Sequence, residues 1–60
     1  MFEIFLTFEN EEEITFKNVI NFQVLTQDGK TYLGLGLREG VETSFPLEDI
    51  TEFKYVYKRA

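Results

Sequence analysis

The sequence predicts an all-β fold: five antiparallel strands in one strongly curled sheet or small barrel, with one short helical turn before the last strand. Three observations carry this prediction. Apolar residues alternate with polar ones along most of the chain, which is the two-residue period of a half-buried strand. Asp28-Gly29 separates two such runs, and glycines recur in the run that follows. No segment has the length and periodicity of an ordinary helix.

The Asp28-Gly29 pair predicts a type I′ turn between the second and third strands. Such a turn needs positive φ at both central residues, which Asp tolerates and Gly adopts without steric cost. The turn sets the expected cross-strand pairs: Thr26 with Thr31, Val24 with Leu33, Phe22 with Leu35 and Ile20 with Leu37. A slip of one residue would turn the apolar set to solvent, so turn and pattern agree on one register.

The first strand is expected over residues 2–8, and the second from about residue 13 to 26 with a bend near Lys17-Asn18. Between them we predict a three-residue loop, Asn10-Glu11-Glu12. This loop places Phe8 opposite Ile14 and Leu6 opposite Phe16, so that apolar residues face each other.

Gly34 and Gly36 predict strong bending or a close backbone approach in the third strand. Arg38-Glu39-Gly40 predicts a three-residue loop with Gly40 left-handed, because the two-residue alternative would oppose apolar to polar residues. The expected pairs are Leu37 with Val41, Leu35 with Thr43 and Leu33 with Phe45. Pro46 ends the fourth strand, and one helical turn then precedes a last strand over residues 51–58.

This order of elements resembles the SH3-like small barrels: four strands in a meander, glycines that curl the sheet, and a single turn leading into a fifth strand. The resemblance covers nearly the whole chain and implies that the last strand runs antiparallel to the first. No ALYDY-like segment is present, so no binding residues of that family are assigned. The composition, rich in Ile, Asn, Lys, Glu and Phe, also looks like that of small accessory proteins of phages or mobile elements.

Length and charge narrow the classes of function. Sixty residues form a single β domain, 1–60, near the lower size limit for folding without disulfides or metals, and seven Phe and three Tyr supply its core. No signal peptide or membrane span is predicted, so a cytoplasmic protein without a membrane partner is expected. Eleven acidic against six basic residues give a net charge of −5, which disfavours direct nucleic-acid binding.

The residues that most enzymes rely on are missing. The chain has no His and no Cys, which removes the usual general base and nucleophile pairs. Carboxylate catalysis would need a cleft, and a small barrel filled by its own side chains offers little cavity. We therefore expect no enzymatic activity and no metal or other cofactor.

Two binding hypotheses remain. In the first, an apolar face opposite the core binds a protein partner or a second copy of the chain through Phe5, Val19, Leu25 and Tyr32. In the second, the first and third loops meet at one end of the meander, far from the basic tail, and the chain inhibits a DNA- or RNA-binding enzyme by mimicking nucleic-acid charge. The carboxylates of that acidic end are Glu9, Glu11, Glu12, Glu13, Glu39 and Glu42.

Overall fold

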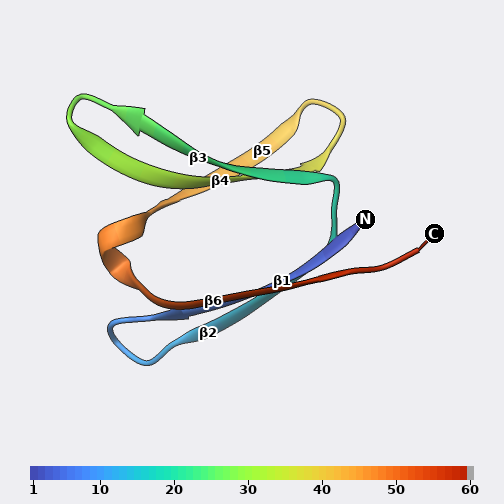
Figure 1. The fold of residues 1–60 in the computed structure, drawn as a ribbon, viewed down its shortest axis with the longest axis horizontal. Coiled ribbons are helices and arrows are strands. Elements are labelled where there is room, and N and C mark those ends of the chain that lie inside the picture. Colours follow the sequence, from blue (N-terminus) through green and yellow to red (C-terminus); the bar gives the residue numbers. More distant parts are fainter. Residues whose placement is uncertain (60) are drawn as a thin grey trace.

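In the computed structural model, which describes residues 1–59, six strands form two three-stranded antiparallel sheets, one above the other (Figure 1). The lower sheet has the order β2-β1-β6 and the upper one β3-β4-β5. The elements are β1 (Phe2–Phe8), β2 (Glu13–Val19), β3 (Asn21–Gln27), β4 (Lys30–Arg38), β5 (Val41–Pro46), the 3-10 helix η1 (Leu47–Asp49) and β6 (Ile50–Tyr57). The all-β class and the single helical turn before the last strand are confirmed.

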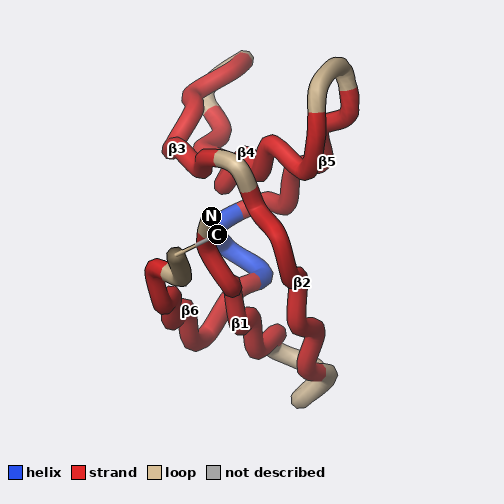
Figure 2. Tube along the Cα trace, turned by 90° about the vertical axis from the view of Figure 1, so that its right-hand side faces the viewer, coloured by secondary structure: helices blue, strands red, loops and turns tan. Residues whose placement is uncertain are grey.

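The core lies between the two sheets. Figure 2 shows the backbone of both sheets from the side. Its fully buried members come from β1, β2 and β4, and the rings of β1, β2, β3 and β5 pack around them. The buried residues are Ile4, Leu6, Val19, Leu33 and Leu35. None of the residues that the structure describes belongs to a helix long and apolar enough to cross a membrane.

The expected five-stranded sheet is wrong at the second strand, which divides into β2 and β3 at Ile20. Asn18 has a φ of 61°, and the pairing of β1 with β2 shifts by one residue between Ile4 and Phe2. This irregularity inserts a residue and reverses the alternation of inward and outward side chains. The chain then turns into the upper sheet, so the strands form two open sheets rather than one curled sheet or a closed barrel.

The register of the first hairpin also differs from the prediction, by two residues. Leu6 pairs with Ile14 and Thr7 with Glu13, so the loop lies one residue earlier in the chain than Asn10-Glu11-Glu12. The amide of Phe8 donates to the carbonyl of Glu12 at 2.9 Å, and Glu11 takes the left-handed φ of 70°. A shift of two residues keeps each side chain on its face, so the hydrophobic pattern alone did not distinguish the registers.

The other two hairpins follow the sequence more closely. Asp28 and Gly29 have φ values of 52° and 78°, and the pairs from Thr26–Thr31 to Phe22–Leu35 are confirmed. The pairs Leu33–Phe45 and Leu35–Thr43 are confirmed as well, with Gly40 at a φ of 76°. Two outer pairs are wrong. Val41 pairs with Arg38 after a register shift, so two residues, Glu39 and Gly40, connect the strands in place of the expected three-residue loop. Ile20 lies outside β3, with its amide donating to the carbonyl of Gly36.

Strand β6 runs antiparallel to β1, as expected, from the pair Thr7–Glu52 to the pair Phe2–Tyr57. The amide of Lys58 donates to the carbonyl of Met1 at 2.7 Å, and the amino terminus of Met1 donates to the carbonyl of Lys58 at 3.1 Å. The Lys58 ammonium also pairs with the carboxylate of Glu3. The basic tail therefore lies beside the N-terminus, on the far side of the molecule from the β1–β2 loop (Figure 1).

Candidate functional site

The largest exposed aromatic side chains lie on β6. Phe53, Tyr55 and Tyr57, here called the aromatic stripe, pair with Leu6, Ile4 and Phe2 of β1, and directly paired residues project from the same face of a sheet. The stripe therefore points to the side that carries the core. Yet its members are 36%, 56% and 64% exposed, because the upper sheet covers them only in part. Exposed apolar surface of this kind is typical of a contact site.

Two further rings hold the stripe in place. Phe2 of β1 lies with its ring centroid 5.3 Å from that of Tyr57, and Phe22 of β3 lies 5.1 Å from Tyr55 and 5.6 Å from Phe53. Phe2 and Phe22 also contact each other edge-on at 5.1 Å. Such tilted and edge-on contacts are favourable for aromatic rings, so the stripe is a packed surface rather than a set of free side chains.

The backbone of β6 is open along its outer edge, because no other strand of residues 1–59 pairs with that edge. Met1 and Lys58 exchange two hydrogen bonds, and bonded and non-bonded pairs alternate along an antiparallel ladder. Glu52, Lys54 and Val56 therefore bond to β1, whereas the three residues of the aromatic stripe direct their N–H and C=O groups outward. An edge of this kind is a template for an additional strand.

The predicted apolar face is not formed. Val19 is fully buried, because the irregularity at Asn18 turns it into the core and leaves Ile20 44% exposed instead. Phe5 lies half-buried in the lower sheet, away from Leu25 and Tyr32, which pair with each other in the upper sheet.

Leu25 packs over Gly34 of β4. A Cβ built on Gly34 would meet the Cδ1 atom of Leu25 at 3.2 Å, so this side chain occupies the space above the glycine. The atom that approaches Gly34 most closely thus belongs to a side chain of β3 and not to the backbone that we expected from the sequence. Leu25 is 42% exposed and separate from the stripe in sequence and strand, which makes it a useful control position.

The predicted acidic end is divided. The β1–β2 loop, with Glu9, Glu11, Glu12 and Glu13, and the β4–β5 hairpin, with Glu39 and Glu42, lie at opposite extremes of the molecule in both views (Figures 1 and 2). The expectation was wrong because it assumed a continuous meander, whereas the corner at Ile20 sends the later hairpins into the other sheet. Asp49 joins the first loop instead, where its carbonyl accepts a hydrogen bond of 2.9 Å from the amide of Glu9.

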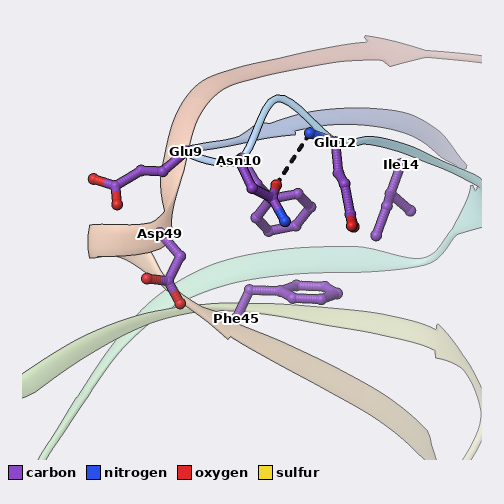
Figure 3. Close-up of a pocket in the computed structure, with 7 residues that line it drawn as sticks. Glu9, Asn10, Glu12, Ile14, Phe45 and Asp49 are labelled. Atoms are coloured by element: carbon purple, nitrogen blue, oxygen red, sulfur yellow. Dashed lines mark hydrogen bonds between the residues drawn. The ribbon is translucent and has the colours of Figure 1, made fainter.

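A shallow pocket of about 430 Å³ lies beside this loop (Figure 3). Three apolar side chains and four polar ones line it: Phe8, Ile14, Phe45, Glu9, Asn10, Glu12 and Asp49. In Figure 3 the carboxylates of Glu9 and Asp49 lie to one side and that of Glu12 to the other, and nowhere in residues 1–59 do three metal-ligating side chains gather closely enough to hold an ion. An apolar wall with a negative rim suits the stem and charge of a Lys or Arg side chain.

The sequence contains a signal for the aromatic stripe. Phe53, Tyr55 and Tyr57 alternate at the period of a strand, which places them on one face but does not show whether another sheet covers that face. Burial depends on the neighbouring sheet, which the pattern within one strand does not describe. Comparison of the chain with protein-family models, with curated proteins and with solved structures finds no match.

Proposed function

We propose that this chain is a non-enzymatic protein-interaction module, which binds a protein partner or a second copy of itself along the aromatic stripe. One observation carries the proposal: three packed aromatic side chains, 36–64% exposed, stand on an edge strand whose backbone groups are unpaired within residues 1–59. Aromatic residues are enriched at protein interfaces, and an open edge adds backbone hydrogen bonds to the side-chain contacts. The pairing of the last strand with the first supports a relation to the SH3-like small barrels, in an opened form.

A second candidate is an acidic inhibitor that occupies the cationic groove of a DNA- or RNA-binding enzyme. The net charge of −5 and the carboxylate-rimmed pocket at the first loop favour it. The separation of Glu39 and Glu42 from that loop counts against it, because the surface that would imitate a phosphate array is smaller than expected.

A partner isolated on the immobilised chain and identified by mass spectrometry separates the two candidates. Its affinity is measured for the wild type, for Tyr55→Ser, and for the matched control Leu25→Ser, which also removes an exposed apolar side chain. If the stripe is the contact site, Tyr55→Ser weakens binding about tenfold or more and the control leaves it unchanged.

The same partner is then titrated at low and at moderate salt. Binding through the stripe weakens little with salt, whereas binding through clustered carboxylates weakens steeply. Wild-type affinity in Tyr55→Ser, together with a steep loss of binding in salt, would replace the first candidate with the second.

A further inference from the structure

We infer that the aromatic stripe takes a second copy of this chain, with two β6 strands paired antiparallel about a two-fold axis at Tyr55. The inference rests on the proposed function and names the occupant of the same surface. It would join the two β2-β1-β6 sheets into one continuous sheet across the axis.

The backbone geometry permits this pairing. With the axis at Tyr55, this residue lies opposite its own copy and Phe53 lies opposite Tyr57 of the second chain. These are the three residues whose N–H and C=O groups point away from β1. Each outward N–H of one chain therefore meets an outward C=O of the other chain. The two aromatic stripes then lie side by side on one face of the joined sheet.

The charges select this register. On the opposite face of the sheet, Glu52 lies directly across from Lys58 of the second chain, and symmetry repeats this favourable pair. Moving the axis by one residue in either direction opposes Lys54 to its own copy or to Lys58, which are like-charge pairs. An axis at Phe53 also avoids these pairs, but it would bring Tyr57 opposite Asp49 in η1, outside the strand.

The other open edges are less suited to pairing. The irregularity at Asn18 interrupts β2, and Pro46 ends β5 without an amide donor. Strand β3 carries no charged side chain that would choose a register. Strand β6 pairs with β1 without interruption over 52–57, and so presents a regular edge.

A charge exchange tests the inference by sedimentation equilibrium on the full chain. Glu52→Lys and Lys58→Glu should each weaken the dimer about tenfold, because each puts like charges opposite each other twice. The double variant restores opposite charges across the axis and should return the dimer to within about threefold of the wild type. Within one chain the exchange adds no favourable contact. It removes the contact of Glu52 with Lys54 at 3.7 Å and the pair of Lys58 with Glu3.

A synthetic chain N-methylated at the Tyr55 nitrogen provides a second test that keeps every side chain. It removes a donor that points to the open edge and none that bonds to β1, so the dimer should be lost while the circular dichroism of the folded chain persists.

A wild type that stays monomeric at the highest soluble concentration, or a double variant no tighter than the singles, would overturn the inference. Rescue by Glu52→Lys with Lys54→Glu instead would overturn the register by moving the axis to Phe53. A monomer that still binds a different partner in a Tyr55-dependent way would refute the dimer alone and leave the proposed function standing.

Discussion

Substitution of Gly29 by Val tests the turn that organises the upper sheet. Gly29 has a φ of 78°, and a Cβ added there would have no heavy atom within 4 Å. The cost is therefore confined to the backbone, where a left-handed conformation costs an ordinary residue about 1–2 kcal/mol and a β-branched one more. The smaller entropy of the unfolded Val chain offsets up to about 1 kcal/mol of this. We expect a net loss of about 1 kcal/mol or more.

The assay is thermal unfolding followed by far-ultraviolet circular dichroism. For a domain of this size, about 1 kcal/mol lowers Tm by about 4–8 °C. Gly29→Asn is the matched control, because Asn adopts positive φ more readily and should lose less than about 0.5 kcal/mol. Gly40→Val should resemble Gly29→Val, since Gly40 has a φ of 76° and equally open surroundings. An unchanged Tm for Gly29→Val, or an equal loss for Asn, would refute the backbone explanation.

Three further predictions concern the core and the first loop. Val19→Lys should prevent folding because it buries a charge, while Ile20→Lys should leave the circular dichroism and Tm nearly unchanged, and equal effects would contradict the reversal of faces at Asn18. Leu35→Ala should cost about 2–5 kcal/mol in chemical denaturation, because the side chain is 1% exposed. Replacing the glutamates at 11–13 by Gln should leave Tm unchanged or slightly raised through weaker self-repulsion, and a clear fall in Tm would show that they stabilise the loop.

Local chemistry determined what the sequence could predict. The Asp28-Gly29 turn and the apolar pairs beside it agree in one register, and that register is confirmed from the pair Thr26–Thr31 to the pair Phe22–Leu35. The loop after Phe8 lacks such a turn signal, and two registers that differ by two residues bury the same side chains. The position of the irregularity was also visible, since the bend near Lys17-Asn18 lies at the residue with positive φ.

The consequences of that bend could not be read from the pattern. A single residue at positive φ exchanges the environments of Val19 and Ile20, and it also decides which sheet receives every later strand. Both predicted sites depended on a continuous meander: one placed Val19 outside, and the other brought Glu39 close to the first loop. The candidate surface that remains lies along β6. It is exposed because the two sheets do not fully cover each other, and this depends on tertiary packing.

Salt dependence connects the charge of the chain to its proposed partners. Two copies that each carry a net charge of −5 repel each other, and salt screens that repulsion. The pair of Glu52 with Lys58 across the axis is exposed to solvent, so it contributes little affinity and acts mainly on the register. Burial of the aromatic stripe would supply the affinity, and salt does not weaken it. A β6 dimer should therefore tighten from low to moderate salt, whereas a complex of the acidic loop with a cationic partner should loosen, so the sign of the change distinguishes the two surfaces.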